Sequence, residues 1–141
     1  MAHRLFQVGI KALITNSDGY VLLLNAHAFK ENAAHWDLPG GRIEDKQSPE
    51  DALCREIEEE TGITEVDDIE FFSACISNFE LDFDDVGKVG LVLMAYTVHI
   101  PENSTIVISD EHSEYEWVSR AEAADRLTYK YPKDFTDALN S

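Results

Sequence analysis

The sequence predicts one α/β domain, in which a mixed β-sheet carries helices on both of its faces. Strand-like segments rich in Val, Ile and Leu outnumber the segments that carry helix signals. Two or three helical segments are interspersed with these strands, an order typical of helices packed on both sides of a mixed sheet. The length of 141 residues and a hydrophobic content of 44% suit a single core, so we expect no second domain.

The chain opens with a predicted β-hairpin. Residues 5–15 and 20–26 are rich in β-branched and aliphatic side chains. Residues 16–19, Asn-Ser-Asp-Gly, form a strong turn cluster between them. The two segments are therefore expected to be the first two strands.

A glycine-rich loop follows the hairpin. Residues 27–35 read as an irregular connection, and residues 36–41, Trp-Asp-Leu-Pro-Gly-Gly, end in Gly40 and Gly41. Glycine allows positive φ angles and a close approach of the backbone to other groups. We expect this loop to lie against a substrate.

Helix signals bracket residues 49–61. Ser48 is a good N-cap, Pro49 suits the first helical position, and Gly62 suits the position after the last turn. At 100° per residue, one arc of this helix is apolar and is predicted to be buried. It consists of Leu53, Cys54, Ile57 and Thr61.

The second half of the chain alternates strand and turn signals before it ends in helices. We expect strands at 70–77, 88–100 and 115–118, a half-buried strand at 78–84, a short β-branched run at 105–108, turns or loops at 101–104 and 110–113, a helix at about 120–127 and one more short helix within 128–141.

Composition excludes several classes of partner. The net charge of −17 would repel a nucleic acid polymer, because such binding depends on clustered Lys and Arg. No apolar run approaches the roughly 18 residues of a membrane helix, and no secretory leader opens the chain, so we expect a cytoplasmic protein that binds no membrane. Cys54 and Cys75 lack metal-site spacing and are expected to be buried apolar residues.

Three carboxylates share one face of the 49–61 helix. Glu56, Glu59 and Glu60 stand at i, i+3 and i+4, so they can converge on a hard divalent ion. Acidic runs more often face water, and a solvated helix face is the alternative. Negative charge near a helix C-terminus is locally unfavourable, which favours a cation that offsets it.

The residues around these glutamates form a longer pattern. Gly41, Arg55-Glu56, Glu59-Glu60 and Gly62-Ile63 stand at fixed spacing within residues 41–63. This pattern resembles the signature of the Nudix hydrolase family, and residues 36–41 and 114–118 resemble further segments of that family. The resemblance implies one Nudix domain over residues 1–141, with the signature at 41–63, and an α/β/α sandwich.

The resemblance also implies an activity. Nudix hydrolases use Mg²⁺, with Mn²⁺ as an alternative, to hydrolyse a diphosphate linkage in a nucleoside diphosphate derivative by attack of water at phosphorus. A nucleoside or deoxynucleoside triphosphate is the first expectation for the substrate. A nucleotide sugar such as ADP-ribose, or a dinucleoside polyphosphate, is the alternative. A Nudix-fold module that senses a nucleotide without hydrolysing it is the alternative from another class.

Roles for individual residues follow from the matched positions. Glu56, Glu59 and Glu60 match the metal ligands of the family, and Arg55 matches the arginine that orients a glutamate. Glu58 occupies a variable position and is expected to face solvent. The residues that we expect to take part in catalysis are Glu60, Glu59, Arg55 and Glu111, and those expected to contact the substrate are Gly40, Gly41 and Arg42.

The sequence does not decide which residue is the general base. Glu111 is the first candidate, because the family often brings a further carboxylate over the site from a loop. Glu114, His112 and Glu60 itself are the alternatives.

Gln47 departs from the family pattern, which usually has Glu at this position. If the family residue mainly orients Arg55, Gln47 can preserve the geometry, because its amide still accepts a hydrogen bond. If that residue supports a metal ion, the substitution weakens the affinity for a further ion.

No substrate motif emerges from the remaining sequence. Candidate side chains for stacking on a base are Phe29, Trp36, Phe79, Phe83 and Tyr96, and candidate phosphate contacts are Arg4, Lys11 and Arg42. Residues of these types more often belong to the core or the surface, and this is the alternative for each of them. The expected partner is a small nucleotide, and a homodimer is common for domains of this size.

Overall fold

A computed structural model describes residues 3–28 and 32–141 of the chain. In this part of the chain, one seven-stranded sheet contains β1 (Phe6–Thr15), β2 (Val21–Ala26), β3 (His35–Asp37), β4 (Gly40–Arg42), β5 (Asp67–Phe83), β6 (Gly87–His99) and β7 (His112–Val118). The helices are α1 (Pro49–Thr61), α2 (Arg120–Arg126) and α3 (Lys133–Leu139). The predicted α/β fold is confirmed.

The first strand organises the sheet. The main path of neighbours runs β3, β2, β1, β6, β5, while β4 also pairs with β1 and β7 also pairs with β2. β1 is parallel to β6, from Phe6 opposite Gly90 to Thr15 opposite His99, and antiparallel to β2 and β4. The sheet is therefore mixed, as predicted.

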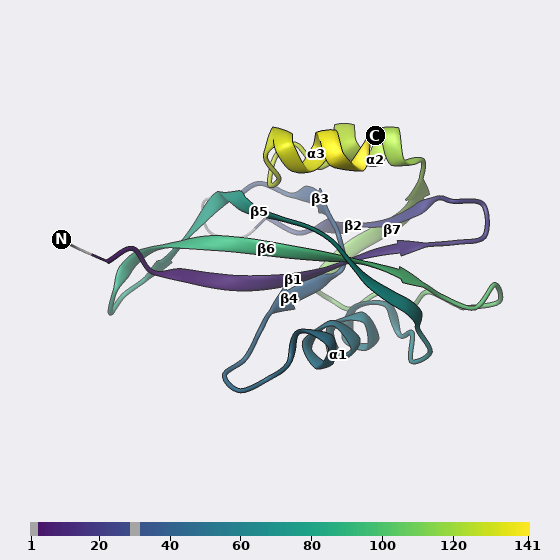
Figure 1. The fold of residues 1–141 in the computed structure, drawn as a ribbon, viewed down its shortest axis with the longest axis horizontal. Helices are drawn as coiled ribbons and strands as arrows, with labels where there is room; N and C mark the ends of the chain where they lie inside the picture. The colour runs from purple at the N-terminus through teal and green to yellow at the C-terminus, as the bar shows by residue number, and fades with distance from the viewer. Residues whose placement is uncertain (1–2, 29–31) are drawn as a thin grey trace.

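Helices cover the sheet on both sides. Figure 1 shows α1 on one side of the sheet and α2 with α3 on the other. Alternate residues of β1 supply the two cores that result. Leu13 belongs to the core that contains Leu127 and Phe135, whereas Ile10 belongs to the core that contains Leu53.

The caps of α1 match the sequence signals. The hydroxyl of Ser48 accepts a hydrogen bond from the backbone N–H of Asp51 at 3.2 Å, and Gly62 follows the helix with a φ of 77°. Leu53, Ile57 and Thr61 are buried as predicted. Cys54 is exposed, so its predicted burial is wrong, because the buried stripe includes Ala52 in its place. Cys75 is buried.

Three segments differ from the sequence prediction. The two strands expected at 70–77 and 78–84 form one strand, β5, because β6 pairs with it along most of its length. The segment 36–41, expected to be a loop, contributes to β3 and β4, which are too short to give a periodic pattern. Residues 105–108 form no strand. No helix in the described ranges is long and apolar enough to cross a membrane.

Candidate active site

The last two turns of α1 bring two carboxylates against the Gly40-Gly41 backbone. The core beneath α1 fixes the rotation of the helix, because Leu53 and Ile57 are fully buried. Glu56 and Glu60, one turn apart, consequently face β4, whereas Glu58 is exposed as expected. The Glu59 side chain is 57% exposed and lies between these two orientations.

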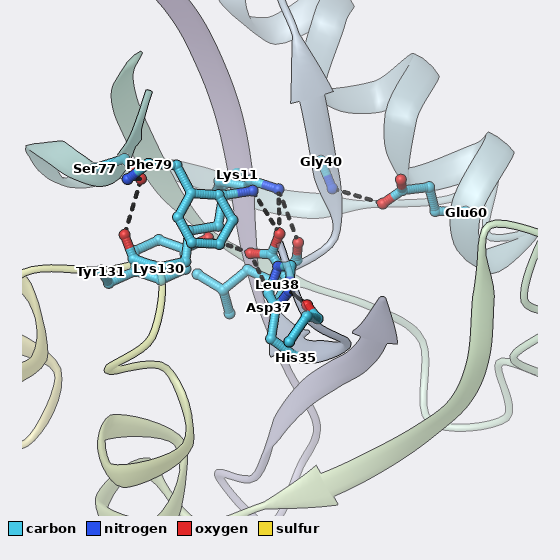
Figure 2. A network of polar contacts seen from close by, with 11 residues as sticks. Lys11, His35, Asp37, Leu38, Gly40, Glu60, Ser77, Phe79, Lys130 and Tyr131 are labelled. Atoms are coloured by element: carbon cyan, nitrogen blue, oxygen red, sulfur yellow. Dashed lines mark hydrogen bonds and ion pairs between the residues drawn. The ribbon is translucent and has the colours of Figure 1, made fainter. Parts of the chain in front are cut away.

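Glu60 is the buried member of the acidic face. Only 6% of the residue is exposed, and its Oε1 accepts a hydrogen bond from the backbone N–H of Gly40 at 2.8 Å (Figure 2). Burial raises the pKa of Glu60 to about 7, against the opposing effect of Lys11 and of this hydrogen bond. The site therefore holds a carboxylate whose charge needs a cation near it.

Glu56 lies so close to Gly41 that a side chain at this position would displace the Glu56 carboxylate. A Cβ atom added to Gly41 would lie 2.5 Å from the carboxylate carbon of Glu56. Gly40 is constrained in a different way, since its φ is +150° and a Cβ would lie 2.0 Å from the backbone oxygen of Ile10. Gly40 therefore shows both expected properties of glycine, unusual φ and close approach, whereas Gly41 shows only the close approach.

Arg55 holds the acidic face together. Its Nη1 lies 3.0 Å from Oε1 of Glu56 and 3.6 Å from Oε1 of Glu59. Burial raises the pKa of Glu56, while Arg55 acts in the opposite direction. Arg55 therefore contacts two of the glutamates, and its role in orienting one of them for catalysis stays a prediction.

Gln47 positions the other side of the Arg55 guanidinium. Its Oε1 lies 3.5 Å from Nη2 of Arg55 and accepts a shorter bond, of 3.0 Å, from the backbone N–H of Glu44. Gln47 thus provides a hydrogen-bond acceptor at this position without a negative charge.

The residues at the start of β7 lie close to Glu60. One ligand atom from each of Glu60, Glu111 and His112 lies within 4.8 Å of the other two. Glu114, the alternative candidate base, lies elsewhere, with its Oε1 3.4 Å from Nδ2 of Asn25. The structure therefore brings two of the three loop candidates to the acidic face.

The donor set fits a divalent cation. Within residues 3–28 and 32–141, Glu60, Glu111 and His112 are the group of potential ligands that meets the 4.8 Å spacing. Glu56 and Glu59 lie outside this group, and their role as ligands stays a prediction. Carboxylate oxygens are preferred by hard divalent ions, and the mutual repulsion of Glu56 and Glu60, which contributes to the raised pKa of Glu60, would be relieved by one.

A buried charge network lies behind the Gly40 backbone. Asp37 Oδ2 accepts bonds from Nζ of Lys11 and of Lys130, at 3.1 and 2.7 Å. Asp37 Oδ1 accepts bonds from the hydroxyl of Tyr131 and the backbone N–H of Leu38, at 2.6 and 2.8 Å. Figure 2 shows this network beside Gly40 and Glu60. Sequence reasoning missed it.

The network corrects the role expected for Lys11. Its Nζ is buried and bound to Asp37, so the prediction that Lys11 contacts phosphate is wrong. The signal that could have revealed this is its position in the apolar run of β1, where a charged residue must find a buried partner. Burial acts to lower the pKa of Lys11, but Asp37 and Glu60 outweigh it and the net shift is upward.

Comparison with known proteins identifies the family. The family model described as the NUDIX domain matches residues 5–139. The chain belongs to the Nudix hydrolase family. The enzyme class and the fold predicted for the chain are confirmed by this match together with its structural neighbours.

Individual relatives of this Nudix hydrolase differ in coverage. A CTP pyrophosphohydrolase of Escherichia coli (strain K12) is 28% identical over 116 residues, which cover 82% of this chain and 78% of that protein. An octanoyltransferase of Myxococcus xanthus is 31% identical over 107 residues, 71% of this chain, but this region spans only 27% of that protein. The crystal structure of a MutT protein from Methanosarcina mazei Go1 has a TM-score of 0.67 and 27% identity, and the match covers 99% of this chain and 94% of that one.

The remaining candidates for substrate contact are distributed over both faces of the Nudix fold. Arg42 and Phe83 lie together, with the guanidinium carbon 5.7 Å from the ring centroid, and both line a hollow of about 520 Å³ that also includes Phe79. Tyr96 packs into the core under α1, and Trp36 lies beneath the guanidinium of Arg126. Arg4 forms an ion pair with Glu80. Phe29 lies outside the described residues.

Proposed function

We propose that this Nudix hydrolase cleaves a diphosphate linkage in a nucleoside or deoxynucleoside triphosphate, by attack of water at phosphorus. The observation that carries the proposal is the position of Glu60 between the Gly40 backbone and the side chains of Glu111 and His112. Its buried carboxylate is held by the Gly40 N–H, and Glu111 and His112 lie within 4.8 Å of it. Such a cluster suits chemistry in which charge on phosphate oxygens must be offset.

Glu56, Glu59 and Glu60 are the proposed ligands of Mg²⁺, with Mn²⁺ as the alternative. The bound ion would neutralise phosphate oxygens and lower the pKa of the attacking water. Arg55 keeps the Glu56 carboxylate in place through its 3.0 Å contact. Gly40 fixes Glu60 through its backbone N–H.

Glu111 is the proposed general base. It is exposed, so water reaches it, and its carboxylate lies within 4.8 Å of a Glu60 ligand atom. A carboxylate at that distance can accept the proton of a water molecule held between the two groups.

The proposed position of the substrate depends on β4. Gly40 and Gly41 adjoin the two glutamates, and Arg42, the next residue, lines the hollow beside Phe83. We propose that Arg42 contacts the phosphate chain and that the nucleoside extends into this hollow. The name of the Escherichia coli relative, a CTP pyrophosphohydrolase, supports a nucleoside triphosphate.

A substrate panel tests the proposal. The purified chain is assayed with Mg²⁺ against ribonucleoside and deoxynucleoside triphosphates, ADP-ribose, a dinucleoside tetraphosphate and a short RNA with a 5′-triphosphate. Reaction in ¹⁸O-labelled water shows which phosphorus is attacked. We expect turnover of a free triphosphate and less of the RNA, because the net charge of −17 opposes the additional phosphates of the RNA.

Other outcomes select between the alternatives. Turnover of ADP-ribose or of the tetraphosphate alone would assign the chain to those substrates. If no compound is hydrolysed while nucleotide and Mg²⁺ raise the melting temperature, the chain is a binding module. Gel filtration on the same sample tests the expected homodimer, and limited proteolysis tests whether residues 1–141 form one domain.

A further inference from the structure

The Glu111-His112 pair is held in place by backbone contacts. The backbone N–H of His27 donates to the carbonyl of Glu111 at 3.5 Å, and the N–H of His112 donates to the carbonyl of Ser109 at 3.2 Å. His112 also begins β7, opposite Ala26 of β2. The backbone that carries the imidazole is thus fixed by pairing with β2, close to Glu60.

The His112 ring retains an unused nitrogen. Its Nδ1 atom is shielded from solvent and has no hydrogen-bond partner in the described part of the chain. A neutral imidazole carries one nitrogen with a free lone pair. A buried imidazole nitrogen without a partner is unfavourable unless another group uses it.

The spacing between His112 and Glu60 fits a shared ion. Two ligands on opposite sides of one ion stand roughly 4 Å apart, because each metal bond measures about 2.1 Å. The ligand atoms of His112 and Glu60 lie within 4.8 Å of each other. A small rotation of either side chain would bring them to the distance that one shared ion needs.

We propose that His112 supplies a nitrogen ligand to the metal ion bound at Glu60, which raises the affinity of the site for a transition-metal ion such as Mn²⁺ more than its affinity for Mg²⁺. Mg²⁺ is bound almost entirely by oxygen, whereas a site of carboxylates and one imidazole binds first-row transition-metal ions through both oxygen and nitrogen. This inference rests on the proposed function, in which Glu60 holds a metal ion and Glu111 remains the base. It assigns His112 a role that the Nudix signature at 41–63 does not contain.

Pulsed electron paramagnetic resonance of the Mn²⁺-loaded protein tests the ligand directly. Electron spin echo envelope modulation detects the ¹⁴N nucleus of an imidazole bound to Mn²⁺. We expect this coupling in the unmodified protein and its loss in His112→Gln. The matched control is His27→Gln, which removes a neighbouring exposed imidazole but keeps the backbone bond to Glu111, and there the coupling should persist.

Affinity measurements give a second readout. By isothermal titration in the absence of nucleotide, His112→Gln should weaken Mn²⁺ binding by about tenfold or more and change Mg²⁺ binding by less than about threefold. Mn²⁺ that binds without nitrogen coupling would overturn this inference and leave the proposed function standing. A protein that binds neither ion, with or without nucleotide, would overturn both. Nitrogen coupling lost in His27→Gln would overturn the assignment to His112.

Discussion

Lys11 Nζ lies 3.1 Å from Oδ2 of Asp37, and the two side chains are only 6% and 7% exposed. This ion pair connects β1 to the strand that precedes Gly40. Because Asp37 also binds Lys130, Tyr131 and the Leu38 N–H, both oxygens of its carboxylate are fully used. A buried charge is tolerated only when it is paired and hydrogen-bonded in this way.

Asp37→Asn should destabilise the fold by about 3 to 5 kcal/mol, because it removes the carboxylate that is paired with two buried ammonium groups. Urea unfolding at neutral pH measures the change. Asp137→Asn is the matched control, since Asp137 pairs with Lys133 on the exposed face of α3 and such pairs contribute roughly 0 to 1 kcal/mol. Equal losses in the two variants would contradict the importance of the buried network.

The cost of Asp37→Asn should depend on pH. Burial acts to raise the pKa of Asp37, but Lys11 and Lys130 outweigh it and hold the pKa well below its usual range. Folding therefore favours the ionised form, and this stabilisation is fully present above about pH 4 to 5 and is lost as the pH falls further. The difference in unfolding free energy between the two proteins should narrow from pH 6 to pH 3. A constant difference would show that Asp37 acts through its shape alone.

Glu60→Gln should abolish most turnover, on the order of 10²-fold or more, while the protein stays folded. The amide oxygen can still accept the bond from the Gly40 N–H, and a neutral group tolerates burial better than a carboxylate. Steady-state kinetics and thermal unfolding are measured together. Glu58→Gln, one of the exposed glutamates of α1, is the control and should leave both unchanged. Full activity of the Glu60 variant would remove this residue from the mechanism.

Gln47→Ala should lower kcat by roughly tenfold, because Arg55 and the N–H of Glu44 both lose their acceptor. Gln47→Glu keeps the acceptor and should retain at least the original kcat. Comparison of kcat and of Mg²⁺ affinity in the two variants shows whether Gln47 acts on Arg55 or on the metal ion. A large gain of metal affinity in Gln47→Glu, with little effect of Gln47→Ala, would mean that the position serves the ion and not Arg55.

Two adjacent glycines should respond differently to alanine. In Gly41→Ala the new methyl group meets the end of the flexible Glu56 side chain, so we expect a folded protein with reduced activity. In Gly40→Ala it meets the backbone of β1 at an unfavourable φ, so we expect a loss of stability as well. Circular dichroism and activity assays distinguish the two effects. A fully active Gly41→Ala would show that the position of Glu56 is not critical.

Local signals allowed much of the fold to be predicted. Ser48, Pro49 and Gly62 define the ends of α1 through contacts within a few residues, and the predicted helix agrees with the structure. The spacing of Glu56 and Glu60 likewise placed both on one face, since helical geometry alone determines it. Cys54 was misplaced because Ala52, two positions before it, completes the buried stripe instead.

Long-range contacts were beyond the sequence signals. Asp37 and its partners Lys130 and Tyr131 are separated by 93 and 94 positions, and no periodic pattern relates them. Glu111 was anticipated near the site only through the family resemblance. Which ring atom of His112 is buried depends on how the loop meets β2, and a single sequence does not contain that information.

The bonds from Lys130 and Tyr131 to Asp37 also bear on how the protein is made. During synthesis, Lys11 and Asp37 leave the ribosome long before their last two partners. The strand that carries Gly40 cannot be fully anchored until residue 131 has emerged and the intervening loop has closed. Nascent chains should therefore acquire the hydrolase site only after residue 131 has emerged, and those released earlier would be inactive.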